Sequence, residues 1–190
     1  MEFNTKFAMP EKHPVACVAA GVFESRKLSG AADALDKAAH GHIREVLRSG
    51  DMDGKMGTTR LLYSVRGVAA ERVLLVGLGR EKEFGEKEYR DCARAALAAV
   101  QETGARDASL YFAELEVPGR DAAWNARQLV LAAADITYRF DRMKSKVHRT
   151  EATAQAASEL LSDDVGEKFA AMEKQEEIDR LLADLKAKRK

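Results

Sequence analysis

The segment Val15-Ala-Cys-Val-Ala-Ala-Gly-Val-Phe23 decides the fold class of this chain. It is a nearly continuous apolar run, as expected for a β-strand that is covered on both faces. Residues 72–78 form a second such run, and residues 29–48 have apolar side chains at helical spacing. Strands that alternate with amphipathic helices predict an α/β fold in which helices pack on a mostly parallel or mixed sheet.

The remaining elements extend this alternation. Ser29 is the expected N-cap of the helix over 29–48, and Gly50 is its expected stop. Further helices are predicted over 86–103, closed by Gly104, and over 121–134. Further strands are predicted over 61–65 and 108–112, with an edge strand over 3–7.

Composition divides the chain into two regions. Twelve of the 13 glycines lie between Gly21 and Gly119, and only Gly166 comes later. Glycine supplies the positive φ that turns need, so its loss indicates that turns give way to long helices. We therefore predict an α/β domain over residues 1–140 and a helical tail over 141–190, the tail built from helices at about 141–161 and 164–188.

The tail carries an apolar stripe with a charged opposite face. Such a stripe must be buried against another surface, which predicts a protein partner or self-association through this helix. The candidate interface residues are Phe169, Met172, Ile178, Leu181, Leu182 and Leu185.

Charge and cysteine content exclude several classes of protein. The chain has 31 basic and 31 acidic side chains, whereas a dedicated nucleic-acid binder usually has a basic excess. No apolar run reaches the roughly 18–20 residues of a membrane span. The two cysteines, Cys17 and Cys92, suit a reducing compartment and make no disulfide framework. We therefore expect a cytoplasmic protein that binds neither DNA nor membranes.

No motif predicts catalytic, cofactor-binding or metal-binding residues. Gly77-Leu-Gly79 invites a phosphate-loop interpretation, but Lys82 breaks the full GxGxxG pattern, which favours a structural turn. His40 and His42 lie two apart on a predicted helix, so they would face different directions. Cys92 has no neighbour that would activate its thiol.

Aromatic and basic side chains near the end of the first region also have a structural interpretation. Tyr111, Phe112, Trp124 and Tyr138 are expected to be core or interface anchors. Three arginines are spaced as a possible DNA-binding stripe, but acidic residues lie among them, which favours an ordinary solvated face. These are Arg120, Arg127 and Arg139.

Residues 1–140 resemble the N-terminal domain of the leucyl aminopeptidase family, the M17 peptidases. The segments that carry the resemblance are residues 1–6 (MEFNTK), 19–24 (AAGVFE), 72–80 (RVLLVGLGR), 102–104 (ETG) and 119–121 (GRD). The resemblance implies a macrodomain-like mixed sheet flanked by helices. In that family this domain is accessory, and a separate C-terminal domain holds the two catalytic metals. The signature of that domain, Asn-Thr-Asp-Ala-Glu-Gly-Arg, does not occur in this sequence.

Residues from about 140 onward resemble the C-terminal helices of the phage-shock protein A family. The carrying segments are residues 140–144 (FDRMK), 151–155 (EATAQ), 158–161 (SELL), 168–173 (KFAAME) and 178–188 (IDRLLADLKAK). The long coiled-coil hairpin and the membrane-seeking first helix of that family have no counterpart here, so membrane binding is not implied.

Together these patterns predict a protein that is not an enzyme. The favoured function is a non-catalytic accessory, regulatory or assembly domain of aminopeptidase type that acts through protein–protein contacts. One alternative is a subunit or fragment that supports a metal-dependent leucyl aminopeptidase. Another is a phage-shock-like stress adaptor that acts through the tail. The sequence leaves open the partner, the oligomeric state, any small ligand, and whether the tail docks on the sheet.

Overall fold

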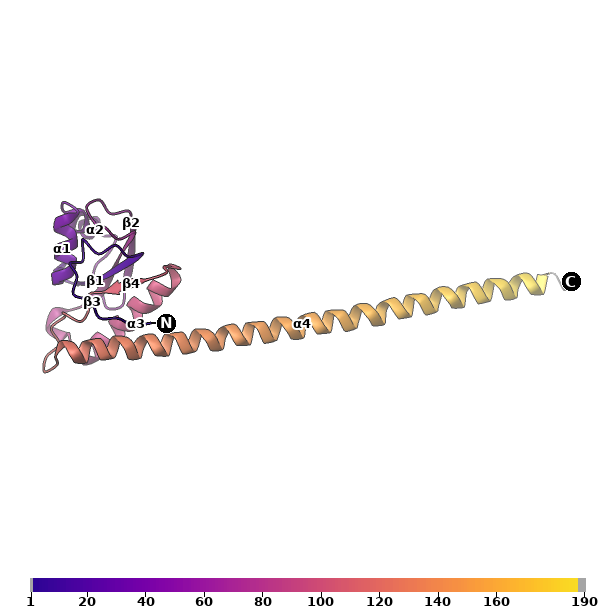
Figure 1. The fold of residues 1–190 in the computed structure, drawn as a ribbon. Coiled ribbons are helices and arrows are strands. Elements are labelled where there is room, and N and C mark those ends of the chain that lie inside the picture. Colours follow the sequence, from indigo (N-terminus) through magenta and orange to yellow (C-terminus); the bar gives the residue numbers. More distant parts are fainter. Residues whose placement is uncertain (1, 188–190) are drawn as a thin grey trace. The chain divides into compact units, whose positions relative to one another are not determined.

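The computed structural model describes residues 2–187 (Figure 1). The chain divides into two compact units, Met1–Tyr138 and Arg139–Lys190. The first unit contains the whole sheet. The last helix of the chain begins in the first unit and supplies the helical part of the second.

The sheet has four strands in the order β2-β3-β1-β4. Their bounds are β1 Cys17–Phe23, β2 Thr59–Tyr63, β3 Arg72–Gly79 and β4 Ala108–Leu110. The central strand β1 runs parallel to both β3 and β4, whereas β2 is antiparallel to β3. The predicted mixed sheet is therefore confirmed, and the two apolar runs that predicted it are its two central strands.

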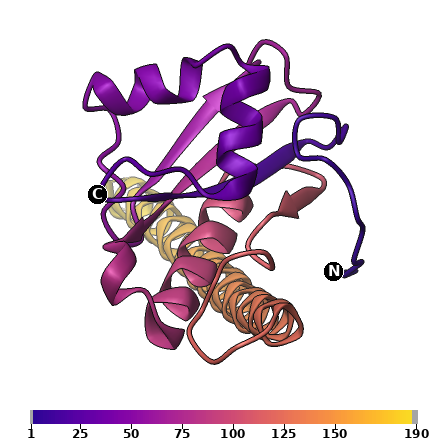
Figure 2. The same cartoon turned by 90° about the vertical axis from the view of Figure 1, so that its left-hand side faces the viewer.

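The helices are α1 Gly30–Ala38, α2 His42–Arg48, α3 Glu86–Glu102 and α4 Ala122–Ala187, with a short 3-10 turn at Glu81–Glu83. Alternate residues of the central strands feed two separate cores. Cys17 and Leu74 face α3 and the start of α4, while Val18 and Val73 face α1 and α2. Figure 2 shows the strands with helices on both faces. Because helices cover both faces of the sheet, the residues on both sides of the central strands are apolar.

The helix predicted over 29–48 is in fact two helices. His40 and Gly41 both have positive φ, 54° and 89°, and separate α1 from α2. The apolar stripe nevertheless continues into α2, because Ile43 and Leu47 are buried in the same core as Leu35. Ser29 is the N-cap of α1, as expected, and its Oγ accepts the N–H of Ala32 at 3.3 Å.

Three strand predictions, over 3–7, 61–65 and 108–112, need correction. Residues 3–7 form no strand, and Phe7 is fully exposed, so the alternating pattern has no surface to bury against. Strand β2 ends at Tyr63 because Ser64 has a φ of 49° and turns the chain. The strand predicted over 108–112 likewise stops at Leu110.

The N-terminal segment is held by one side of β4 and its flanks. The Ala16 N–H donates to Asp107 Oδ1 at 2.8 Å, and Ser109 Oγ lies 2.9 Å from His13 Nδ1. Tyr111 Oη donates to the Ala8 carbonyl at 3.0 Å. Residues that are two apart on an extended strand share a face. Asp107, Ser109 and Tyr111 therefore lie on the same side, and all three bind the segment 8–16.

The helices predicted at the end of the first region and in the tail also differ from the observed one in their boundaries. Three helices were expected over 121–134, 141–161 and 164–188, but Ala122–Ala187 is one continuous helix. The Asp163-Asp164 pair therefore lies inside a helix rather than at its start. Alanine, glutamate, lysine and leucine dominate this stretch and have high helix propensity, which outweighs the weak start signal of two aspartates.

Candidate functional site

The glycine pair at the end of β3 is occupied by the chain itself. The Gly77 N–H donates to the Thr58 carbonyl at 2.7 Å, and the Gly79 N–H donates to the Gly54 carbonyl at 2.9 Å. A Cβ on Gly77 would lie 1.9 Å from the Lys55 carbonyl oxygen. These two amides are therefore not free for a phosphate, and the glycines let the 54–58 loop pack against the strand.

Both cysteines are buried, and neither has the environment of a nucleophile. Burial raises the pKa of the Cys17 thiol, and it raises the pKa of the Cys92 thiol to about 12. Cys92 Sγ donates to the Gly77 carbonyl at 3.3 Å. A nucleophilic cysteine needs an accessible thiolate, whereas these thiols stay protonated inside the core.

The histidine pair does not lie on one helix. His40 lies in the turn between α1 and α2, and His42 is the first residue of α2, where its Nδ1 is 3.8 Å from Glu45 Oε2. The described residues contain no group of three or more His, Cys, Asp or Glu side chains that could hold a metal ion. Among the same residues, no helix combines the length and apolar character needed to cross a membrane.

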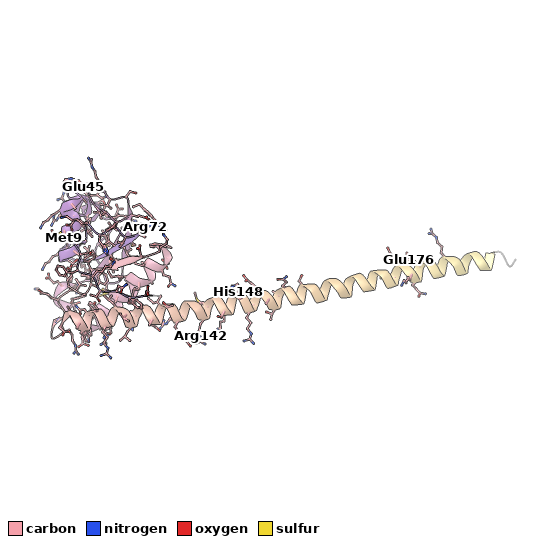
Figure 3. All side chains as sticks on the ribbon, viewed as in Figure 1. Met9, Glu45, Arg72, Arg142, His148 and Glu176 are labelled. Atoms are coloured by element: carbon pink, nitrogen blue, oxygen red, sulfur yellow. The ribbon has the colours of Figure 1, made fainter. Side chains whose placement is uncertain are left out.

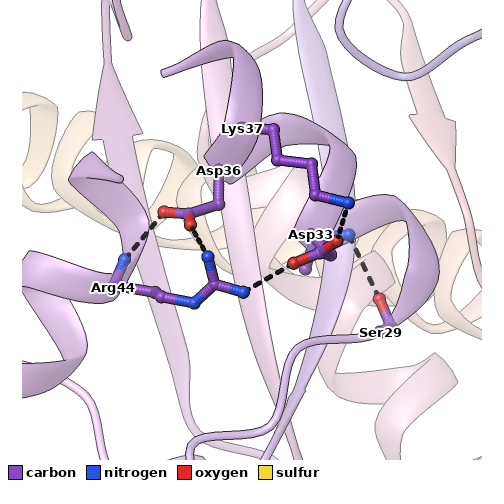
Figure 4. A network of polar contacts seen from close by, with 6 residues as sticks. Ser29, Asp33, Asp36, Lys37 and Arg44 are labelled. Carbon is purple, nitrogen blue, oxygen red and sulfur yellow. Dashed lines mark hydrogen bonds and ion pairs between the residues drawn. The ribbon is translucent and has the colours of Figure 1, made fainter. Parts of the chain in front are cut away.

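The buried polar contacts between α1 and α2 have a structural role (Figure 4). Asp36 is fully buried, and its carboxylate accepts the Arg44 backbone N–H at 2.9 Å and an Arg44 guanidinium N–H at 2.6 Å. The other guanidinium arm donates to Asp33 at 2.6 Å. Because the N-cap of α2 is Gly41, which has no side chain, Asp36 supplies the missing cap from the neighbouring helix.

The most elaborate surface cluster surrounds Trp124, near the start of α4. The guanidinium carbons of Arg90 and Arg120 lie 5.5 and 5.4 Å from the indole ring, which is cation–π distance. Glu86 binds both arginines, at 3.0 Å to Arg90 Nη2 and 2.6 Å to Arg120 Nη2. We call Glu86, Arg90, Arg120 and Trp124 the tryptophan–arginine cluster.

The tryptophan–arginine cluster packs on the protein core on one side and is open to solvent on the other. The indole packs against the buried Tyr89 ring, with centroids 5.5 Å apart, and Tyr89 Oη donates to the Asn125 carbonyl at 3.0 Å. Gly119, Arg120, Asp121 and Trp124 line a shallow, open hollow. Tryptophan and arginine are the residue types most enriched at the energetic centres of protein interfaces, so the cluster is suited to a protein contact.

Sequence reasoning placed Trp124 among the anchors but missed Glu86 and Arg90. The i,i+4 spacing of these two residues on α3 was the available signal. In the possible arginine stripe, which the sequence disfavoured, Arg120 is not a free cation, because it is paired with Glu86. Among the other expected anchors, Phe112 is buried, Tyr111 is half-buried, and Tyr138 is exposed.

Of the six candidate interface residues of the tail, only Met172 has a described side chain, and it is 62% exposed. The side chains of Phe169, Ile178, Leu181, Leu182 and Leu185 lie outside the described ones. The interface assignment therefore remains a prediction.

The fold of the first unit is that of the macrodomains. A macrodomain of Mycobacterium tuberculosis DarG aligns with a TM-score of 0.55 and 8% identity, covering 70% of this chain and 89% of that one. A macrodomain of Oceanobacillus iheyensis aligns with a TM-score of 0.53 and 14% identity, covering 68% and 73%. At such low identity the likeness concerns the fold alone.

Residues 19–147 match the model of the cytosol aminopeptidase family, N-terminal domain, and this chain belongs to that family. The probable cytosol aminopeptidase of Nitrosospira multiformis is 51% identical over 151 residues, which are 80% of this chain and 29% of the relative. That of Methylobacillus flagellatus is 53% identical over 146 residues, or 77% and 29%. The chain thus spans less than a third of the length of these relatives.

None of these comparisons supports the resemblance to phage-shock protein A. The aminopeptidase family model extends to residue 147, so it includes the first residues of the segment for which that resemblance was expected. The start of the tail is therefore similar to the aminopeptidase family itself.

Proposed function

We propose that this chain is a non-catalytic accessory domain of the cytosol aminopeptidase type, which acts in assembly or regulation through protein–protein contacts. The observation that carries the proposal is the family match, because it is to the N-terminal domain and spans residues 19–147. We expect the protein to act in the cytoplasm, in keeping with the name of its relatives.

The chemistry of the described residues supports a role without catalysis. Hydrolysis by two metal ions needs several converging carboxylates, and no such group occurs among the described side chains. The two thiols are buried, and the N–H groups of Gly77 and Gly79 are bonded to their own loop. The tryptophan–arginine cluster is the part of the described surface that best fits a macromolecular contact.

A peptidase assay tests the absence of catalysis. The purified chain is incubated with leucine-p-nitroanilide and either Mn²⁺ or Zn²⁺, and the release of p-nitroaniline is followed at 405 nm. We expect no turnover above the rate with metal alone. A full-length cytosol aminopeptidase is the positive control. Metal-dependent turnover by the pure chain would contradict the proposal.

A second candidate function is a subunit that supports a complete, metal-dependent leucyl aminopeptidase. The high identity to the N-terminal parts of such relatives favours it, since similar surfaces can make similar contacts. Co-sedimentation with a full-length relative, and the activity of that enzyme with and without this chain, test it. Arg120→Ala should weaken the association if the tryptophan–arginine cluster is the contact. Arg94→Ala removes an arginine that lies outside this cluster and is the control.

A third candidate is a phage-shock-like adaptor that acts through the helix of the second unit. Only the tail sequence favours it. Binding of the full chain to liposomes of anionic lipid tests it, and absence of binding removes the membrane form of this function.

A further inference from the structure

The second unit exposes apolar side chains along a long helix. Within it, Met143 and Val147 are 61% and 54% exposed, and Met172 is similarly exposed. Figure 3 also labels polar neighbours on the same helix, Arg142, His148 and Glu176. Long helices gain most of their stability from packing of an apolar face rather than from propensity. This stretch also contains Gly166, an unfavourable residue inside a helix.

The apolar residues of this helix follow a seven-residue repeat. With Phe140 as position a and Met143 as position d, ten of the fourteen a and d positions through residue 185 are apolar. The four exceptions are Thr150, Asp164, Lys168 and Gln175. The apolar a positions are Phe140, Val147, Ala154, Leu161 and Leu182, and the apolar d positions are Met143, Ala157, Ala171, Ile178 and Leu185. A repeat of this kind is typical of helices that pair in a coiled coil.

The a and d positions together form the seam between the two helices. The residues at the flanking positions e and g support the same register. Five of the six candidate interface residues fall at a, d, e or g, and only Phe169 falls at b. The outward f positions are occupied by polar or small residues, including Ser145, Glu173 and Arg180. Glycine at position 166 is also an f position, where the missing side chain leaves no gap in the seam.

The charges at positions e and g indicate that the partner is a second copy of this chain and that the two helices run parallel. In a parallel pair of identical helices, g of one heptad faces e of the next heptad on the partner. Lys146 would then face Glu151 of the second copy, and Lys174 would face Asp179 of the second copy. One like-charge pair also arises, between Arg139 and Lys144 of the second copy. In a fully overlapping antiparallel pair, Lys146 would instead lie beside Leu181 of the second copy, and both of these opposite-charge pairs would be lost.

We propose that residues 139–187 form a parallel, in-register, two-stranded coiled coil with a second copy of this chain. The inference rests on the proposed function, because it names the partner of the expected protein contact. It assigns Glu151 and Lys146 to the specificity of pairing, and the a and d residues to its stability.

Sedimentation of the full chain and two charge reversals test the pairing. The full chain should be a dimer at micromolar concentration. Glu151→Lys should raise the dimer dissociation constant about tenfold, because two symmetric attractions become repulsions. Glu173→Lys makes the same change of charge at an f position and should leave the constant unchanged. Circular dichroism should show equal helix content for both variants.

The double variant Lys146→Glu/Glu151→Lys separates pairing between chains from effects within one helix. It should restore the dimer, because opposite charges again face each other across the seam. It does not restore the contact within the chain between His148 and Glu151, whose Nδ1 and Oε2 lie 3.7 Å apart. Failure of this rescue would overturn the assigned register.

A cysteine at position d tests the orientation. In a parallel, in-register dimer the two copies of residue 150 lie in one layer, so Thr150→Cys should form an interchain disulfide under mild oxidation. Ser145→Cys, at position f, should not. A monomeric full chain, or a dimer without the residue-150 cross-link, would overturn this inference. The proposed function would still stand if such a chain lacks peptidase activity and binds a full-length relative.

Discussion

Asp36 and Arg44 are joined by two hydrogen bonds, one from the Arg44 backbone N–H and one from its guanidinium group. The first satisfies a donor at the start of α2, and the second neutralises a carboxylate that has no contact with water. The short helix α2 therefore depends on a side chain of α1 for its N-terminal cap.

Asp36→Ala should lower the free energy of unfolding by about 2–3 kcal/mol, because it removes both the cap and the buried ion-pair partner. The loss stays moderate because Arg44 is half exposed, so water can solvate its guanidinium. Urea unfolding followed by circular dichroism measures the change. Asp91→Ala removes an exposed carboxylate from a surface pair with Arg94 and should have little effect. Equal effects of the two substitutions would contradict the capping role.

Stability should fall in alkaline solution. Burial raises the pKa of Cys92 from 9.0 to about 12, and it also raises the pKa values of Cys17 and Tyr89. Such groups keep their protons in the folded chain after they have lost them in the unfolded chain. Their contribution is complete below the unfolded pKa and is lost as pH rises toward the folded pKa. The urea midpoint should therefore decrease from pH 8 to pH 11.

Cys92→Ala provides the control for this alkaline dependence. The variant loses one of the contributing groups, so its midpoint should fall less steeply above pH 9, whatever its stability at neutral pH. A slope identical to that of the unchanged chain would show that the thiol ionises equally in both states.

Gly77→Ala should destabilise the first unit by about 3 kcal/mol, since its methyl group would overlap the Lys55 carbonyl oxygen. Backbone on a loop that is bonded to the same strand cannot move aside cheaply. Gly30→Ala is the matched control, because the nearest atom to its Cβ is Glu114 Oε1 at 3.4 Å and the position begins a helix. Thermal unfolding should separate the two variants, and similar melting temperatures would be inconsistent with the packing of this loop.

The N-terminal segment should become sensitive to protease when its contacts with the β4 side are removed. His13→Ala and Tyr111→Phe each delete one hydrogen bond that holds residues 8–16, so trypsin should cleave after Lys12 faster in both variants. Tyr63→Phe changes an exposed tyrosine on β2 and is the control. Mass spectrometry identifies the cut, and an unchanged rate in both variants would mean that other contacts hold the segment.

The strands that could be predicted were those whose signal is local. Val18 to Val22 and Val73 to Leu78 are apolar on both sides, and that pattern is sufficient to place a covered strand. The break at His40 and Gly41 was missed because the stripe from Leu35 to Ile43 continues across it. Helical periodicity cannot reveal a turn that returns the next helix to the same face.

The tryptophan–arginine cluster could not be predicted from the order of residues along the chain. Glu86 and Arg90 belong to α3, whereas Arg120 and Trp124 lie at least 30 positions later in the sequence. Only the packing of α3 beside the start of α4 brings the four residues together. The same holds for Asp36, whose role as a cap requires the fold to turn α2 back onto α1.

By itself the sequence determined the class of fold and the two central strands, because burial on both faces and helical propensity depend on residues that are neighbours in the chain. Its segments also identified the family to which the chain belongs. Tertiary structure alone decided the strand order, the cap from Asp36, and the grouping of two arginines around Trp124. These features depend on contacts between segments far apart in the chain, and their geometry is set by how the helices pack on the sheet.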